Sequence, residues 1–184
     1  MKVTRTAIPD VILVEPDIYR DERGDFRETW HAARYAEHGI PTVFVQDNVA
    51  TSRRGVLRGL HYQFADAQGK LVMTLWGEVF DVAVDLRSGS PTFGKWVGEI
   101  LSAGNGRQLW IPEGFAHGYA VISERAVVSY KCTRVYRADV EAAVRFDDPE
   151  IGITWPAGER ILSSKDAAAP LLRDIPSERL PGLG

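Results

Sequence analysis

The alternation that decides the fold class runs through Val79-Phe80-Asp81-Val82-Ala83-Val84-Asp85-Leu86. Side chains of a β-strand point alternately to the two faces of a sheet, so this segment predicts a strand with two distinct faces. An apolar run, Leu71–Trp76, precedes it and predicts a second strand. Gly77-Glu78 lies between the two runs and predicts a hairpin turn that pairs them.

Outward from this pair, short apolar runs recur along the chain. Turn-rich segments such as Ser88–Pro91 and Ala103–Gly106 separate them. The further predicted strands are Val43–Gln46, Trp96–Leu101, Gln108–Ile111, Gly118–Ser123, Val127–Tyr136 and Ala142–Phe146.

Helical signals are few. His31–His38 predicts one short helix, ended by Gly39, and a second helix opens at Ser163–Asp166 and is stopped by Pro170. Many short strands with few helices predict an all-β fold, either a sandwich or a jelly-roll barrel. Since no repeat or linker interrupts the pattern, we expect one domain over residues 1–184.

Composition limits the possible functions. A length of 184 residues suits one well-buried domain, and 45% apolar residues with a net charge of -3 are typical of a globular protein. There is no bulk basic excess for nucleic-acid binding and no apolar stretch of the roughly 18 residues that a membrane span needs. The single Cys132 excludes an intrachain disulfide and a cysteine zinc cluster. The N-terminus lacks the apolar core of a signal peptide, so we expect a cytoplasmic protein.

Two glycine-framed histidines carry the chemistry that the sequence suggests. His61 lies in the run Gly55–Gln63, and His117 lies in the run Ile111–Gly118 on a different β-segment. An imidazole is well suited to take a proton near neutral pH. Arg58, three residues before His61, suits an anionic group such as a diphosphate. Together they predict proton chemistry on a phosphate-tagged small molecule.

One predicted strand face is unusually polar. Strand alternation places Val128, Tyr130, Cys132, Arg134 and Tyr136 on the same side, whereas Lys131 points away. This face is interpreted either as the lining of a polar cavity or as a core edge with amphipathic tyrosines, and the residues alone do not separate the two.

Ordered motifs extend over nearly the whole chain, from Ala7-Ile8-Pro9-Asp10 to about Pro170. They are Asp21-Glu22-Arg23-Gly24 with Phe26 and Glu28, Gln46-Asp47-Asn48, Gly55–Gln63, Gln68–Val72, Gly77–Asp85, Trp110–Gly118, Tyr130-Lys131, Asp147-Asp148-Pro149, Trp155-Pro156 and Ser164-Lys165-Asp166. In this order they resemble the dTDP-4-dehydrorhamnose 3,5-epimerase family of the cupin superfamily.

The resemblance implies a cupin-type double-stranded β-helix, which is a jelly-roll barrel, with a few short helices. It also implies a nucleotide-sugar substrate, no cofactor and no metal. A homodimer is implied as well, with residues 1 to about 50 contributing to the interface and residues 163–184 forming a helical tail.

The implied reaction inverts C3 and C5 of dTDP-4-dehydro-6-deoxy-D-glucose and gives dTDP-4-dehydro-L-rhamnose. Both carbons flank the C4 carbonyl, which acidifies their protons. By resemblance His61 would be the base, Asp166 its carboxylate partner and Tyr130 the acid on the opposite face. Lys70, aided by His117, would stabilise the enolate oxygen.

The resemblance assigns binding residues too. Arg58 and Lys165 would bind the diphosphate, because a guanidinium can hold phosphate oxygens bidentately. The implied nucleotide-binding residues are Tyr19, which would cover the thymine, together with Arg23, Phe26, Glu28, Gln46, Asn48 and Tyr136.

Several of these residues also have a structural interpretation. Asp166 reads as a first-turn acid after a serine cap, which stabilises any helix. Lys70 reads as an edge-strand charge and Arg58 as a loop cation. Asp81 and Asp85 read as structural hydrogen-bonding groups, with Asp81 nearer to the site.

Alternative functions stay open. Ala50, Val135 and Ala138 depart from the family pattern and leave an epimerase acting only at C3 or only at C5 possible. A metal-dependent cupin requires a second histidine two residues after His61, where Gln63 stands. A non-catalytic sugar-nucleotide binder has no use for an imidazole–carboxylate pair with a tyrosine opposite. A 3,4-ketoisomerase of the same fold keeps a different histidine arrangement.

Overall fold

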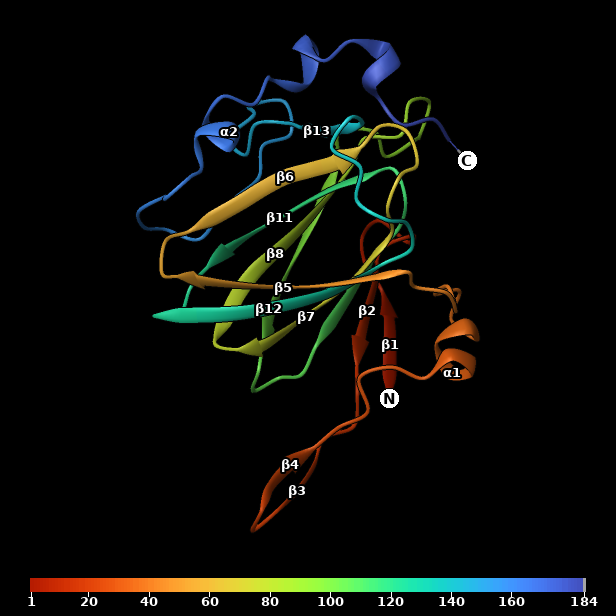
Figure 1. The fold of residues 1–184 in the computed structure, drawn as a ribbon, viewed down its shortest axis with the longest axis vertical. Coiled ribbons are helices and arrows are strands. Elements are labelled where there is room, and N and C mark those ends of the chain that lie inside the picture. Colours follow the sequence, from red (N-terminus) through yellow and green to blue (C-terminus); the bar gives the residue numbers. More distant parts are fainter. Residues whose placement is uncertain (184) are drawn as a thin grey trace.

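The computed structural model describes residues 1–183 and consists of two antiparallel sheets packed face to face (Figure 1). The first sheet has the order β1 (Lys2–Arg5), β2 (Ile12–Glu15), β10 (Gln108–Ile111), β7 (Lys70–Trp76), β12 (Arg125–Cys132) and β5 (Gln46–Arg53). The second has the order β13 (Glu141–Ala143), β6 (Leu57–Gln63), β11 (Phe115–Val121), β8 (Glu78–Asp85) and β9 (Trp96–Ser102).

The strand order is that of a jelly roll. From β5 to β12 the chain builds the neighbours β5–β12–β7–β10 in one sheet and β6–β11–β8–β9 in the other. Each sheet therefore combines early and late strands, as two interlocked Greek keys do. The predicted all-β, cupin-type barrel with few short helices is confirmed.

The turn at Gly77 is a correction to the sequence analysis. β7 pairs with β10 and β12, whereas β8 pairs with β11 and β9, so the predicted hairpin between them is wrong. Gly77 has a φ of +74°, and a Cβ there would lie 2.0 Å from the Arg125 carbonyl oxygen. Glycine is required because the chain crosses from one sheet to the other at this point.

Strand boundaries also differ from prediction in places. The strand predicted at Val43–Gln46 starts where that range ends and continues to Arg53. The strand predicted at Val127–Tyr136 ends at Cys132, where Thr133 turns to accept a hydrogen bond from the Gly69 N–H with its Oγ1. β11 begins at Phe115, earlier than predicted, and β13 ends before Val144.

The helices are as short as expected. α1 (Ala32–Ala36) begins after His31, whose side chain caps it by accepting from the Arg34 N–H. α2 (Ser164–Ala167) is capped by Ser163 and is followed by the 3-10 turns η1 (Leu172–Asp174) and η2 (Ser177–Arg179). No helix among residues 1–183 is long and apolar enough to cross a membrane.

The apolar core fills most of the space between the sheets. Val72, Leu109 and Val128 of the first sheet pack there against Val79 and Phe115 of the second. A second cluster lies beneath the C-terminal tail, and a third lies beneath α1. Buried polar side chains occur on both sheets, among them Ser52 on β5, Gln63 on β6, Asp81 on β8 and His117 on β11.

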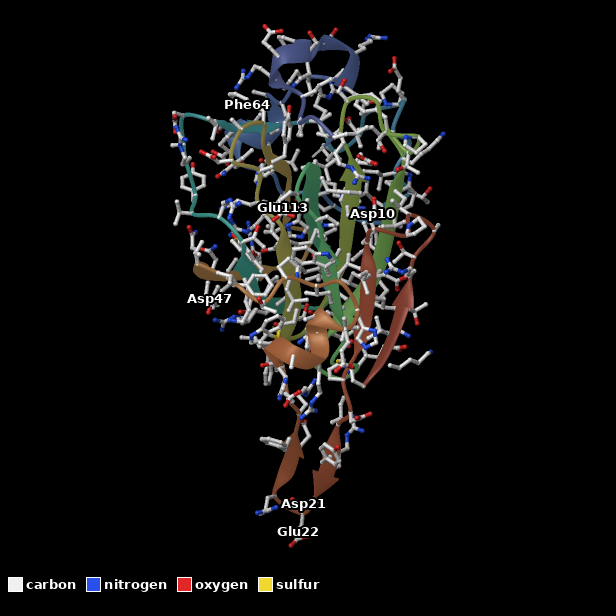
Figure 2. The ribbon with its side chains drawn as sticks, turned by 90° about the vertical axis from the view of Figure 1, so that its right-hand side faces the viewer. Asp10, Asp21, Glu22, Asp47, Phe64 and Glu113 are labelled. Carbon is white, nitrogen blue, oxygen red and sulfur yellow. The ribbon has the colours of Figure 1, made fainter. Side chains whose placement is uncertain are left out.

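A short hairpin, β3 (Tyr19–Asp21) with β4 (Gly24–Phe26), projects from the body as an arm. Figure 1 shows it beyond β1 and β2, and Figure 2 shows Asp21 and Glu22 at its far end. Tyr19 is 65% exposed and Phe26 is 71% exposed. Two aromatic side chains on an isolated hairpin suit contact with another surface.

Candidate functional site

Two glycines bring the two histidines together. Gly59 on β6 and Gly118 on β11 face each other so closely that a Cβ on Gly59 would lie 2.6 Å from the Gly118 Cα. A Cβ on Gly118 would lie 2.6 Å from the Arg58 carbonyl oxygen. The ladder between β6 and β11 is irregular at this point, and beyond it His61 lies directly opposite His117. The glycines that frame the histidines therefore permit their placement on adjacent strands.

His61 is paired with a buried carboxylate. Its Nε2 lies 2.6 Å from Asp166 Oδ1, and Asp166 is only 3% exposed. Burial tends to raise the pKa of Asp166, but the hydrogen bond and charge of His61 outweigh it and the pKa is lowered. An ionised carboxylate on Nε2 leaves Nδ1 as the ring nitrogen that can accept a proton.

Helix α2 supplies this carboxylate. The Ser163 hydroxyl accepts a hydrogen bond from the Asp166 main-chain N–H at 3.1 Å and fixes the first turn. Asp166 is therefore both a first-turn acid after a serine cap and the partner of His61. The two interpretations of this residue are compatible.

Tyr130 approaches the same cleft from the other sheet. It lies on β12, packs against the main core and lines the cleft together with His61 and Lys70. Burial raises the pKa of Tyr130, so its phenol keeps its proton. The strand ends at Cys132, so its alternation does not continue to Arg134 and Tyr136. Tyr136 nevertheless lines the cleft, whereas Arg134 is exposed and does not. The polar-cavity interpretation therefore holds for the tyrosines.

Lys70 lies on β7 directly beside Cys132, at the floor of the cleft. Its side chain is half-buried and lines both lobes of the cleft. Burial lowers the pKa of Lys70, and the nearby Cys132, Asp81 and Glu141 oppose that shift. Lys70 therefore lines the cleft from a central strand of the first sheet, and the edge-strand interpretation is wrong.

His117 has a carboxylate partner of its own. Its Nε2 lies 2.9 Å from Asp81 Oδ2, and Asp81 is completely buried. The other oxygen, Asp81 Oδ1, has no hydrogen-bond partner among residues 1–183. Asp81 thus orients a cleft residue, whereas Asp85 is structural and holds Arg87, Ser90 and Thr92.

The cleft has two lobes that share His61, Lys70 and Tyr130. The outer lobe, of about 220 Å³, is further lined by Gln46, Asn48, Gln63, Gln68, Tyr136 and Glu141. The inner lobe, of about 130 Å³, is further lined by Ala50, Arg58, His117, Gly118 and Tyr119. The sequence-predicted base, acid and oxyanion group therefore meet at the junction of the lobes.

Glu141 is a cleft residue that the sequence analysis missed. Its carboxylate accepts hydrogen bonds from the Tyr136 hydroxyl at 2.8 Å and from the Lys165 ammonium. Burial tends to raise the pKa of Glu141, but these two donors outweigh it and the pKa is lowered. The only sequence signal was its position at the edge of a predicted strand, which says nothing about function.

Five predicted binding residues do not line this cleft: Lys165 contacts it through Glu141, and the other four lie on or near the arm. Tyr19, Arg23 and Phe26 lie on the arm around a hollow of about 450 Å³, and Glu28 forms an ion pair with Arg34 at 3.1 Å. One chain therefore does not bring them to His61 and Tyr130. Their predicted role requires a second chain.

Histidines and carboxylates occur in this cleft as pairs. Within residues 1–183, no group of three or more His, Cys, Asp or Glu side chains is arranged to hold a metal ion. Each imidazole instead has one carboxylate, Asp166 for His61 and Asp81 for His117.

Comparisons with known proteins agree on one family. A sequence model described as dTDP-4-dehydrorhamnose 3,5-epimerase matches residues 5–174. A protein of that name from Pseudomonas aeruginosa is 55% identical over 176 residues, which cover 95% of this chain and 97% of the relative.

Solved structures extend the similarity to the fold. The crystal structure of a dTDP-6-deoxy-D-glucose-3,5-epimerase from Legionella pneumophila in complex with dTDP-4-keto-L-rhamnose matches with a TM-score of 0.97 and 54% identity, covering 100% of this chain and 98% of that one. A 3'-monoepimerase from Streptomyces bikiniensis in complex with dTDP-quinovose matches with a TM-score of 0.89 and 33% identity, covering 96% and 91%.

Proposed function

Because the chain belongs to the dTDP-4-dehydrorhamnose 3,5-epimerase family, we propose that it inverts C3 and C5 of dTDP-4-keto-6-deoxy-D-glucose to give dTDP-4-keto-L-rhamnose. The enzyme is an isomerase. One observation carries the proposal: His61 with its carboxylate and Tyr130 reach a single cleft from opposite sheets, and Lys70 lines the same cleft.

The residues can perform the chemistry without a cofactor. The C4 carbonyl acidifies the protons on C3 and C5, and His61 Nδ1 removes one of them. The electron pair moves onto O4, where Lys70 stabilises the enolate and His117 supports it. Tyr130 then returns a proton to the same carbon from the opposite face, which inverts it. Asp166 stabilises the imidazolium that forms on His61.

The nucleotide and diphosphate would occupy the remaining polar groups. Arg58 and Lys165 bind the diphosphate, and Lys165 exchanges its ion pair with Glu141 for the phosphate oxygens. Gln46 and Asn48 hold the nucleotide, with Tyr136 beside them in the outer lobe.

The site is completed by a second subunit. Tyr19, Arg23, Phe26 and Glu28 reach the cleft of a partner in a homodimer, where Tyr19 covers the thymine. The exposed aromatic arm supports this, and so do Val49 and Leu75, which are 65% and 50% exposed on the outer face of the first sheet. The cytoplasm stays the predicted location.

Proton NMR in deuterated water tests the proposed reaction. The enzyme is incubated with dTDP-4-keto-6-deoxy-D-glucose, and the C3 and C5 signals are followed. We expect deuterium at both carbons and accumulation of the L-configured epimer. Exchange at one carbon alone would instead assign a single-site epimerase, and absence of exchange would contradict the proposal.

A further inference from the structure

Arg58 lines the inner lobe, and a neutral hydroxyl group holds its guanidinium. Arg58 Nε donates a hydrogen bond to the Ser52 hydroxyl at 3.0 Å. In the described part of the chain Arg58 forms no ion pair, whereas Arg87 and Arg107 are held by the carboxylates of Asp85 and Glu15. The guanidinium of Arg58 is thus held at Nε by a neutral group, without a carboxylate partner among the described residues.

The hydrogen bond between Ser52 and Arg58 joins the two sheets. Ser52 lies on β5 of the first sheet and is only 6% exposed, while Arg58 lies on β6 of the second sheet. A guanidinium carries five N–H donors, and Nε supplies only one of them. The donors on the two terminal nitrogens remain for a ligand in the inner lobe, which Arg58 lines.

Tyr119 packs beside this pair. It is the cross-strand partner of Arg58 on β11, and its buried hydroxyl forms no hydrogen bond of good geometry within residues 1–183. Burial raises the pKa of Tyr119, and the charge of Arg58 and the Ser52 hydroxyl oppose that rise. The phenol therefore borders Ser52 and Arg58 without competing for the guanidinium donors.

The fold does not need the Ser52 hydroxyl to close the corner between β5 and β6. Main-chain hydrogen bonds close it already, from Arg54 N–H to Glu124, Gly55 N–H to Val121 and Val56 N–H to Arg53. The main chain thus closes this corner without the hydroxyl. A carboxylate at this position would neutralise Arg58 and compete with an anionic ligand, whereas a hydroxyl does neither.

We propose that Ser52 is a positioning residue that holds Arg58 Nε and so directs the guanidinium at the diphosphate of the nucleotide sugar. The inference rests on the proposed function, because it requires a diphosphate ligand. Ser52 itself does not touch the reacting atoms. It acts on binding, through Arg58.

The first test compares Ser52→Ala with Ser52→Thr, which keeps the hydroxyl. Binding of dTDP is measured by calorimetry, and turnover is measured with the keto-sugar nucleotide. We expect Ser52→Ala to weaken dTDP binding and raise KM about 3- to 10-fold, the effect of one lost hydrogen bond, with kcat changed less than about 2-fold. Ser52→Thr should bind dTDP like the wild type.

A double-mutant cycle shows whether Ser52 acts through Arg58. In an Arg58→Ala background, Ser52→Ala should weaken dTDP binding no further, because the positioned group is gone. Thr74→Val is the matched control. Thr74 also carries a buried hydroxyl, it has no hydrogen-bond partner among residues 1–183, and its loss should leave KM unchanged.

The outcomes separate the two proposals. Equal dTDP binding by the wild type and Ser52→Ala would overturn the role of Ser52 and leave the proposed function intact. A lower melting temperature of Ser52→Ala with unchanged KM would also overturn it, since that is the mark of a structural role. Failure of the wild type to bind dTDP would overturn the proposed function and this inference together.

Discussion

His61 differs from a surface histidine in one respect, the buried carboxylate on its Nε2. This contact fixes the ring orientation and the proton position, and it provides a counter-charge when the ring takes a second proton. The phenol of Tyr130, whose pKa burial raises, is suited to give a proton rather than to take one. The surroundings of these two residues thus support the proposed direction of proton transfer, from the substrate to His61 and from Tyr130 to the substrate.

Replacing Asp166 by asparagine removes the negative charge of the side chain and keeps its volume. In Asp166→Asn we expect turnover to fall by about 10²–10⁴, because the imidazolium loses its counter-charge and the ring its fixed tautomer. Affinity for dTDP should stay near the wild-type value, since Asp166 holds no nucleotide. Steady-state kinetics and calorimetry measure the two effects. Asp174→Asn, in the exposed part of the tail, is the control, and equal turnover in both variants would refute the pairing.

We predict that Lys70 sets the alkaline limit of activity. The Lys70 amine must carry a proton to stabilise the enolate. Burial lowers the pKa of Lys70 below its ordinary value. Burial raises the pKa of Tyr130, so the pH at which the phenol loses its proton moves away from neutral, whereas the lowered pKa of Lys70 moves the loss of its charge toward neutral. We therefore predict that the alkaline fall in kcat/KM follows the deprotonation of Lys70.

The pH profile of Lys70→Arg checks this assignment. A guanidinium stays protonated, so the alkaline fall should move to higher pH even if turnover is reduced. Lys131→Arg is the control, because Lys131 pairs with Asp47 on the outer side of β12, and its profile should not move. An unchanged alkaline fall in Lys70→Arg would rule out Lys70 as the group responsible.

At the scale of elements, the site depends on how closely β6 and β11 approach. Gly118 has no room for a side chain, since a Cβ would meet the main chain of Arg58 at 2.6 Å and the Leu60 side chain at 3.0 Å. Both strands contribute a histidine to the cleft, so any separation of the strands changes the distance between them.

Gly118→Ala should therefore both destabilise the protein and impair activity. Overpacking at a main-chain contact costs about 1–3 kcal/mol, and the displaced His117 should lower turnover beyond what the loss of stability explains. Denaturation in urea and kinetics at low temperature measure the two effects. Gly104→Ala is the control, because its Cβ would meet only Ser102 Oγ at 3.9 Å. Wild-type stability of Gly118→Ala would show that the strands can separate freely.

Sequence periodicity found the elements that bury an apolar face and missed those that do not. Gln108–Ile111 was predicted with its observed bounds, and Val79–Leu86 was predicted within one residue, because both carry core side chains. β5 was mostly missed because Gln46 and Asn48 line the polar cleft while Asp47 and Thr51 are exposed. A strand with two polar faces has no hydrophobic alternation to detect.

The candidate site was predictable where a motif existed. The resemblance indicated His61 and Asp166 as partners although 105 positions separate them, and the structure joins them at 2.6 Å. Glu141 and the link between Ser52 and Arg58 lie outside any motif that the analysis used. Such contacts depend on which strands face each other, and the sheet change at Gly77 shows that local sequence does not reveal this.

At the scale of the whole molecule, we propose that the arm of one chain and the cleft of another form one site. Tyr19 and Phe26 are exposed on the arm, while the outer lobe is open beside Gln46 and Tyr136. A two-fold symmetric dimer lets each arm reach the cleft of its partner, because both subunits use the same pair of surfaces.

Complementation between inactive variants tests this arrangement. One variant combines Arg23→Ala with Phe26→Ala on the arm, and the other carries Tyr130→Phe in the cleft. Mixed dimers unite one intact arm with one intact cleft, so refolding the two together should restore about a quarter of wild-type turnover. Sedimentation should show dimers throughout. No recovery in mixed dimers would mean that arm and cleft act within one chain.

Deuterium exchange in two cleft variants, followed by proton NMR with dTDP-4-keto-6-deoxy-D-glucose, tests the proposed base and acid most directly. His61→Ala should reduce exchange at both C3 and C5 by at least about 10², because no base removes the proton. Tyr130→Phe should still exchange these protons but form little inverted product, because the opposite face has no donor. Wild-type exchange in His61→Ala would contradict the assignment of the base and with it the proposed mechanism.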